Sequence, residues 1–229
     1  MKIIALSVKN GISKTIYTEF IQLITAEKKE SLTNFLFKRD AERTLIAELL
    51  VRLVVIENFG IKNPDIQFGY GVFRKPFIIG LPDFHFNLSH SGDWVICAYD
   101  NEEIGIDVEL INDKSENFIE YCFSNNEYQK YLDSNESDRL PFFYKIWTLK
   151  ESYLKLTGKG FYHDLKLKDI SFISNSFEFQ LHNNFENVNV FSKTLLFNEC
   201  YTLGVSSYSE IKIDIWEVID LEELYSRIV

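Results

Sequence analysis

The chain has 229 residues, of which 46% are hydrophobic and 15% aromatic, and its formal net charge is −10. This composition supports one large or two small folded domains, excludes an intrinsically disordered chain and argues against nucleic acid as the principal partner. No apolar stretch approaches the ~20 residues that span a bilayer. Three widely separated cysteines without a Cys-x-x-Cys pair argue against structural zinc, so we expect a cytoplasmic protein that acts on neither membranes nor nucleic acid.

The first hundred residues are expected to begin with a strand, continue with helices and end in strands. Residues 2–8 form a short apolar run that is more typical of a first strand than of a secretion signal. A polar helix is expected at residues 13–25. A stronger helix is expected at 33–59, because Leu45, Leu49 and Ile56 fall at helical spacing and Gly60 follows. The strands expected after it span residues 77–79, 84–88, 94–99 and 104–109.

The rest of the chain repeats this order. Helices are expected at residues 118–122, 125–132 and 141–157, the last with Pro141 in its first turn and Gly158 just past its end. Strands are expected at residues 170–173, 177–181, 188–191, 201–206 and 211–218. An order of helices followed by strands, stated twice, predicts two related α+β halves that pack together, with residues 1–100 in the first and 101–229 in the second.

Charge is divided unequally between these halves. Residues 1–100 hold 12 Lys and Arg against 11 Asp and Glu, whereas residues 101–229 hold 12 against 23. One half could therefore receive an anion while the other gathers carboxylates around a cation. A solvated acidic surface would give the same numbers.

Residues 104–109, with the sequence I-G-I-D-V-E, place two acids two positions apart in a predicted strand. Asp107 and Glu109 would then project from the same face, while Ile106 and Val108 point into the core. Two carboxylates side by side repel unless a cation or protons lie between them, and such hard oxygen ligands suit Mg²⁺. Taken alone, the pair fits ordinary solvated acids on an edge strand equally well.

Residues 147–155 carry a second group of charged side chains on a predicted helix. Trp147, Glu151 and Lys155 are four apart and share one face. Glu151 could add a third carboxylate to a metal, and Lys150 and Lys155 could meet phosphate oxygens. The alternative is a surface Glu–Lys pair.

Residues 84–92, with the sequence F-H-F-N-L-S-H-S-G, end an alternating strand in a polar turn. Ser89, His90 and backbone amides near Gly92 could hold a phosphate. A nucleophile–base pair of Ser89 and His90 is disfavoured, because adjacent side chains of a strand diverge and no Gly-x-Ser-x-Gly elbow surrounds the serine.

Taken together, these segments resemble the 4′-phosphopantetheinyl transferases of the large, two-halved Sfp (surfactin-synthetase-activating) type, over nearly the whole chain. The (V/I)-G-(I/V)-D signature stands at residues 104–107, W-(S/T/C)-x-K-E-(S/A)-x-x-K at 147–155 and F-N-x-S-H-S-G at 86–92, and residues 40–44 and 75–76 also match. The resemblance implies an α+β fold whose similar halves are related by pseudo-twofold symmetry, with the active site at their interface. Residues 1–100 would bind the 3′-phosphate and adenosine of coenzyme A, and residues 101–229 would hold the metal and dock the carrier protein.

The same resemblance assigns roles to individual residues. Mg²⁺ would be bound by Asp107, Glu109 and Glu151, with coenzyme A as co-substrate. The pyrophosphate of coenzyme A would be contacted by Lys150 and Lys155. Its 3′-phosphate would be surrounded by Lys28, Arg43, Thr44 and His90. Its adenosine would be lined by Lys75, Pro76 and Ser89. A cationic pocket for the 3′-phosphate makes physical sense, because this group separates coenzyme A from ordinary adenine dinucleotides.

Two positions depart from the family pattern. The glycine that precedes Lys-Pro in the family is Arg74 here, which could add a phosphate contact or crowd the adenine. Some relatives carry a second basic residue three positions after Lys28, where this chain has Ser31; Lys29 could compensate.

The reaction implied is attack of a carrier-protein serine on the β-phosphorus of coenzyme A, with 3′,5′-ADP as leaving group. Such a reaction needs mainly positioning and charge stabilisation, which Mg²⁺ and Lys155 would supply. The serine proton would pass to Glu151 or Glu127, and we favour Glu151.

The expected partner is an apo acyl or peptidyl carrier protein, and the enzyme is expected to act as a monomer. Four apolar residues between the two main motifs could dock one of the carrier's helices or could instead pack into the core: Phe118, Ile119, Tyr121 and Phe123. Two other functions use the same residues, a Mg²⁺-dependent nucleotide hydrolase and a non-catalytic module that binds coenzyme A. Retention of all three acids and both lysines argues against the second.

Overall fold

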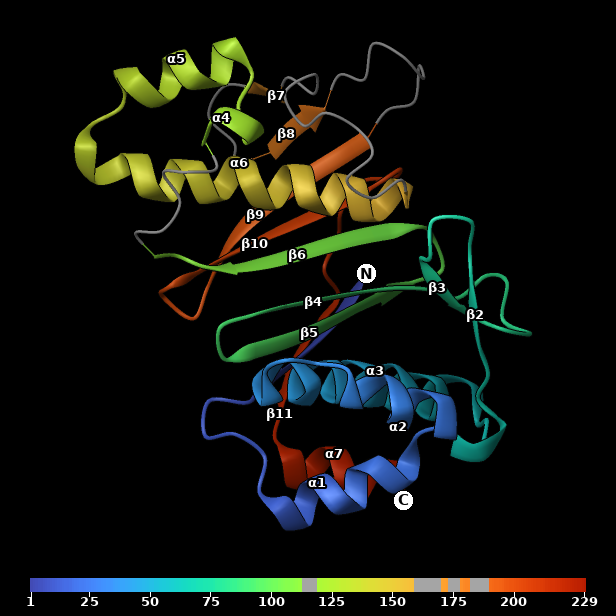
Figure 1. The fold of residues 1–229 in the computed structure, drawn as a ribbon. Coiled ribbons are helices and arrows are strands. Elements are labelled where there is room, and N and C mark those ends of the chain that lie inside the picture. Colours follow the sequence, from blue (N-terminus) through green and yellow to red (C-terminus); the bar gives the residue numbers. More distant parts are fainter. Residues whose placement is uncertain (113–118, 159–169, 173–177, 182–189) are drawn as a thin grey trace.

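The computed structural model describes residues 1–112, 119–158, 170–172, 178–181 and 190–229. Two β-sheets lie between two long helices, so that the molecule is layered (Figure 1). Within the described residues, no helix is long and apolar enough to cross a membrane. These features confirm the α+β prediction.

The first part of the chain builds one sheet and the helices on its outer face. Its elements are β1 (Lys2–Ser7), α1 (Lys14–Phe20), a 3₁₀ turn (Ile21–Leu23), α2 (Ala26–Thr33), α3 (Lys38–Phe59), a second 3₁₀ turn (Asn63–Asp65), β2 (Phe68–Tyr70), β3 (Pro76–Ile78), β4 (His85–Ser91) and β5 (Trp94–Asp100). The strand order is β11-β1-β5-β4, and β2 and β3 form a separate hairpin. Helix α3 is buried over most of its length against this sheet.

The second part builds the other sheet. Its elements are β6 (Ile104–Leu110), α4 (Ile119–Cys122), α5 (Asn125–Asp133), α6 (Glu136–Thr157), β7 (Ile170–Phe172), β8 (Glu178–Leu181), β9 (Val190–Phe197), β10 (Tyr201–Ser207), β11 (Ile215–Ile219) and α7 (Leu221–Ile228). The strand order of this sheet is β6-β10-β9-β8-β7, with α6 on its outer face.

Both halves use the same arrangement. The order β1-β5-β4 of the first sheet corresponds to β6-β10-β9 of the second, and neighbouring strands in both triplets are antiparallel. Each half has one 22-residue helix, α3 or α6, and each of these helices ends at a glycine in the left-handed region, Gly60 or Gly158. The same strand order and helix placement in both sheets are what a fold of two similar halves requires.

The two sheets face each other across an apolar layer. Side chains from β1, β5, β6 and β10 fill it, among them Ile3, Ile96, Ile106 and Leu203, which are fully buried. Ile106 and Val108 thus point into the core, as the alternation along β6 predicts, and the acids between them face α6.

The end of the chain returns to the first sheet. Strand β11 pairs in parallel with β1, and α7 packs on α3, where Arg227 bridges Glu57 and Glu217. The segment between β5 and β6 contains the division predicted near residue 100, whereas β11 and α7 pack against elements of residues 1–100. A parallel pairing between residues more than 200 positions apart leaves no local pattern by which it could be predicted.

Several predicted boundaries were wrong. Helix α6 begins at Glu136, so Pro141 lies inside it. Strand β9 continues to Phe197 and β11 begins only at Ile215. Helices α2 and α7 and strand β2 were not predicted at all. The predicted ends at residues 118, 173, 177 and 188 lie outside the described residues.

Two glycines let α6 lie against its sheet. A Cβ atom on Gly105 would overlap the carbonyl oxygen of Ser152, and one on Gly204 would overlap that of Thr148. Gly204 is also the cross-strand neighbour of Asp107. Gly105 therefore admits the α6 backbone, which brings the side chains of α6 within reach of β6.

Substituting Gly105 with Ala is expected to destabilise the protein by about 3 kcal/mol, because backbone atoms of a packed helix must move. The G60A variant is the control: Gly60 has a positive φ of 66° but no atom within 4 Å of an added Cβ, so only the left-handed backbone costs about 1 kcal/mol. Urea denaturation measures both, and a G105A midpoint no lower than that of G60A would contradict the close packing.

Candidate active site

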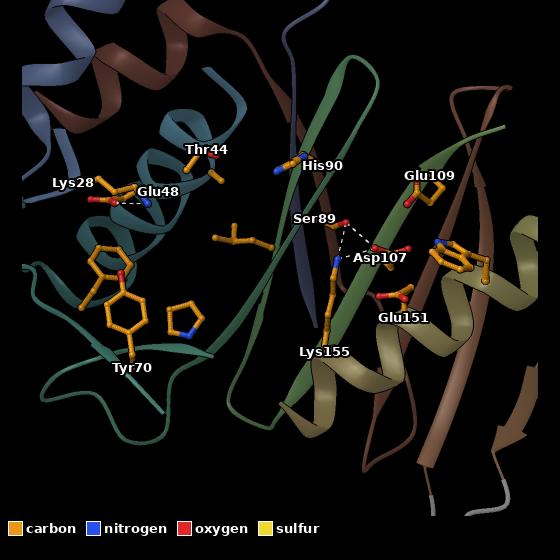
Figure 2. Close-up of a pocket in the computed structure, with 15 residues that line it drawn as sticks. Lys28, Thr44, Glu48, Tyr70, Ser89, His90, Asp107, Glu109, Glu151 and Lys155 are labelled. Carbon is orange, nitrogen blue, oxygen red and sulfur yellow. Dashed lines mark hydrogen bonds and ion pairs between the residues drawn. The ribbon is translucent and has the colours of Figure 1, made fainter. Parts of the chain in front are cut away.

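A cavity of about 510 Å³ lies between the two halves. The first half contributes residues from α2, α3, β4 and the β2–β3 hairpin, and the second contributes residues from β6 and α6 (Figure 2). The lining residues are Lys28, Thr44, Ala47, Glu48, Phe68, Tyr70, Pro76, Leu88, Ser89, His90, Asp107, Glu109, Trp147, Glu151 and Lys155. Nine of the residues predicted for the site are thus brought to one cavity, with acids on one side and Lys28, Thr44 and His90 on the other.

The acids meet as strand and helix geometry predict. Asp107 and Glu109 project from the same face of β6, and Glu151 lies one helical turn before Lys155 on α6. Figure 2 shows Glu151 and Lys155 directed toward Asp107. Trp147, on the same face of α6, donates a hydrogen bond to Glu109.

Lys155 ties the helix to both strands. Its ammonium group lies 2.7 Å from Oδ1 of Asp107 and donates a hydrogen bond to the hydroxyl of Ser89 over 2.9 Å. Ser89 in turn donates to the same Asp107 oxygen over 3.0 Å. Since Ser89 is buried and fully engaged here, the structure places it beside the acids rather than in an adenosine pocket.

Burial raises the pKa of all three carboxyls, and the Asp107 charge adds to the rise at Glu109 and Glu151. The pKa of Glu151 rises from 4.5 to about 7, chiefly through burial and then through the charge of Asp107, although Lys155 opposes this. Burial also raises the pKa of Asp107 against the effect of Lys155 and Ser89. For Glu109, burial and the Asp107 charge outweigh the hydrogen bonds from Ser91 and Trp147. One lysine is therefore not enough to satisfy three acids.

Two buried carboxylate oxygens are directed into the site without a hydrogen-bond partner among the described residues. They are Oδ2 of Asp107 and Oε1 of Glu151. An all-oxygen donor set of this kind fits Mg²⁺. Among the residues that the structure describes, no group of three His, Cys, Asp or Glu side chains is arranged to hold a metal ion, so the assignment of Mg²⁺ to these acids stays a prediction.

The basic residues of the first half divide between the cavity and the scaffold. Lys28 lines the cavity and pairs with Glu48 over 3.3 Å. His90 lines it too, and partial desolvation together with the charges of Arg43 and Lys155 lowers its pKa. Arg43 itself bonds the Gly92 carbonyl over 2.6 Å and pairs with Asp40, so it lies behind His90.

Lys75 is committed to the scaffold. Its ammonium group donates to the carbonyl oxygens of Leu156 at 2.9 Å and Ile104 at 3.2 Å, and burial lowers its pKa. It lines a smaller neighbouring cavity of about 230 Å³. The predicted contact with adenosine can therefore come only from its methylene groups.

Lys150 and Glu127 do not reach the cavity. Both side chains are fully buried, and the Lys150 ammonium group donates to Glu127 and, over 2.7 Å, to the carbonyl oxygen of Cys122. Glu127 also accepts from the backbone of Ser124 in the capping box of α5. This placement does not support the phosphate contact expected of Lys150 or the catalytic role considered for Glu127.

The four apolar residues expected to dock the carrier are separated. Ile119 and Phe123 are buried in the core beneath α6, whereas Tyr121 is 70% exposed. Phe118 lies outside the described residues.

The departure at Arg74 has a backbone explanation. Its φ is 64°, in the left-handed region that glycine adopts most readily, which accounts for the glycine of the family pattern. At the other departure, the Ser31 hydroxyl donates to the Lys28 carbonyl, and Lys29 bonds Gln22.

Sequence reasoning missed five residues of the site. Ala47, Glu48, Phe68 and Tyr70 line the cavity without belonging to a motif, and Ser91 donates to Glu109 over 2.7 Å. Only Ser91 had a detectable signal, because it lies two positions after Ser89 and so faces the same way.

Comparisons with known proteins identify the family of the chain. Residues 103–205 match the family model of the 4′-phosphopantetheinyl transferase superfamily, and residues 12–102 match the model described as 4′-phosphopantetheinyl transferase, N-terminal. The chain therefore belongs to the 4′-phosphopantetheinyl transferases and is a transferase.

Curated relatives point the same way. The chain is 39% identical to 4′-phosphopantetheinyl transferase Sfp of Bacillus subtilis, over 70% of this chain and 71% of the relative. It is 34% identical to 4′-phosphopantetheinyl transferase gsp of Aneurinibacillus migulanus, over 71% and 68%. It is also 30% identical to the human L-aminoadipate-semialdehyde dehydrogenase-phosphopantetheinyl transferase, over 64% and 52%.

The raised pKa of Glu151 predicts how stability depends on pH. With a pKa of about 7 when folded and 4.5 when unfolded, Glu151 contributes nothing unfavourable below pH 4.5, and it destabilises the folded protein progressively as pH rises from 4.5 to 7. The loss is on the order of 3 kcal/mol by pH 8. Glu151→Gln should therefore unfold at a higher temperature than the unsubstituted protein at pH 8 and with little difference at pH 5. The matched control is E102Q, which alters an exposed acid and should follow the unsubstituted curve; an E151Q curve parallel to it would show that Glu151 titrates normally.

Proposed function

We propose that this chain transfers the 4′-phosphopantetheine group of coenzyme A to a serine of an apo acyl or peptidyl carrier protein, with release of 3′,5′-ADP, and that the reaction depends on Mg²⁺. The observation that carries the proposal is the set of three buried acids, two of them with unpartnered oxygens, that faces a cavity lined on its other side by Lys28, Thr44 and His90. The family membership supports the same reaction.

The cavity accounts for the nucleotide part of coenzyme A. Lys28, Thr44 and His90 would contact the 3′-phosphate, with Arg43 supporting His90 from behind. Pro76 and the rings of Phe68 and Tyr70 offer an apolar wall for the adenine. Lys28 would exchange its ion pair with Glu48 for the phosphate, a charge-assisted contact of greater strength.

Asp107, Glu109 and Glu151 would hold Mg²⁺ at the pyrophosphate end of the cavity. When bound, the ion would neutralise charge on the pyrophosphate oxygens of coenzyme A. Lys155, next to Asp107, would contact the same phosphates and stabilise the leaving group.

The transfer exchanges one bond to the β-phosphorus for another. The serine oxygen of the carrier forms a bond to the β-phosphorus, and the bond from that phosphorus to the oxygen bridging the α-phosphorus breaks. 3′,5′-ADP leaves with the electron pair. The serine proton passes to Glu151, directly or through water; the burial of Glu127 against Lys150 leaves Glu151 as the better candidate of the two.

The carrier would dock next to the acids, near α4 and α5. Tyr121, Tyr128 and Leu132 are exposed apolar side chains there, so Tyr121 is the residue of the four expected ones that remains available. One chain supplies both sides of the cavity, which supports action as a monomer. The free cysteines Cys97, Cys122 and Cys200 suit a reducing cytoplasm.

The direct test is incubation with coenzyme A, Mg²⁺ and several apo carrier proteins, with intact-protein mass and 3′,5′-ADP as readouts. We expect equal amounts of modified carrier and 3′,5′-ADP. Nucleotide cleavage that releases free phosphopantetheine without an acceptor would instead indicate a hydrolase.

Asp107→Asn is expected to reduce transfer by at least a thousandfold while leaving a folded protein, because the side chain keeps its shape but loses its charge toward the metal. Glu151→Ala should have a similar effect. Circular dichroism checks the fold, and substantial Mg²⁺-dependent transfer by either variant would contradict the metal assignment.

The role of His90 is tested with two ligands that differ in one group. His90→Ala should weaken binding of coenzyme A roughly tenfold, the value of one charge-assisted hydrogen bond, and leave binding of 3′-dephospho-coenzyme A unchanged. Isothermal titration measures both. An equal loss for the two ligands would remove His90 from the 3′-phosphate site.

A further inference from the structure

The two sheets are joined along β4 and β6 without a backbone ladder. These strands are edges of different sheets, yet three backbone amides of β6 are paired with side chains of β4. Ile106, Val108 and Leu110 donate to Asn87, Ser89 and Ser91 over 2.9, 3.1 and 3.1 Å. The three side chains are two positions apart, and we call them the β4 side-chain ladder. It satisfies amides that would otherwise be buried without partners.

Two of the three members do more than accept an amide. Ser89 donates to Asp107 and Ser91 donates to Glu109, in each case the residue just before the amide that the serine accepts. The distances are 3.0 and 2.7 Å. The hydroxyl of Ser91 accepts the Leu110 amide through a lone pair and has only one proton. It donates that proton to the carboxylate of Glu109. Asn87 has only the amide contact of this pattern.

We propose that Ser91 is a positioning residue for Glu109, and that it sets this acid for the metal as Ser89 sets Asp107. The inference rests on the proposed function, because it gives Glu109 the role of metal ligand. The first half of the chain would thus fix the geometry of acids that belong to the second. Hydrogen-bond donors behind a ligating carboxylate orient it and keep it charged, and their loss commonly weakens metal binding by an order of magnitude or more.

The test measures metal affinity rather than activity. Mn²⁺ is titrated into the full-length protein with saturating coenzyme A, and free Mn²⁺ is followed by electron paramagnetic resonance. We expect Ser91→Ala to weaken Mn²⁺ binding roughly tenfold, and Ser91→Thr, which keeps the hydroxyl, to bind within about twofold of the unsubstituted protein. Ser91→Cys preserves the volume with a weaker donor and should fall between them; it replaces S91A if that variant does not fold.

Asn87→Ala is the matched control. It removes a member of the same ladder and should lower the melting temperature about as much as S91A, but it touches no acid and should leave Mn²⁺ affinity unchanged. Three results would overturn the proposal. N87A and S91A could weaken Mn²⁺ binding equally, or S91A and S91C could bind Mn²⁺ as tightly as the unsubstituted protein. The third is that S91T binds Mn²⁺ as weakly as S91A. An unsubstituted protein that bound no Mn²⁺ even with coenzyme A would overturn the proposed metal site itself, so the two failures are distinguishable.

Discussion

Three carboxylates that share one buried cavity are the constraint on which the site depends. Burial raises the pKa of Asp107, Glu109 and Glu151, the Asp107 charge raises the pKa of the two glutamates further, and Lys155 pairs with Asp107. A pyrophosphate could not enter this site without a cation, because it would add negative charge next to three acids that share one lysine. Substrate and divalent cation should therefore bind together.

The scaffold exists to bring these acids together against their repulsion. Two come from an edge strand and the third from a helix that packs over it, and the distance between strand and helix is set where Gly105 and Gly204 admit the α6 backbone. From the other side, the β4 side-chain ladder holds the edge of β6 in place. The apolar layer between the sheets makes this junction rigid, and rigidity is what keeps like charges close in the absence of a metal.

The sequence predicted those features that depend on local periodicity. A period of two placed Asp107 and Glu109 on one face of β6, and a period of four placed Trp147, Glu151 and Lys155 on one face of α6; the motifs identified which faces met. It could not predict which partner a long side chain would choose. Lys75 bonds carbonyls at the ends of α6 and β6, and β11 pairs with the start of the chain, because of contacts between residues far apart in sequence.

Neighbouring residues of one motif can therefore have unrelated duties, as Lys150 and Glu151 show. Successive residues of a helix point about 100° apart, so while Glu151 faces the cavity, Lys150 turns toward α4 and α5. There it bonds the last residue of α4, Cys122, and Glu127 of the α5 capping box. Removing either partner would leave a buried charge, which is among the most destabilising changes known. A sequence motif thus contains residues that stabilise the fold as well as residues of the site. The direction in which each side chain points distinguishes the two kinds.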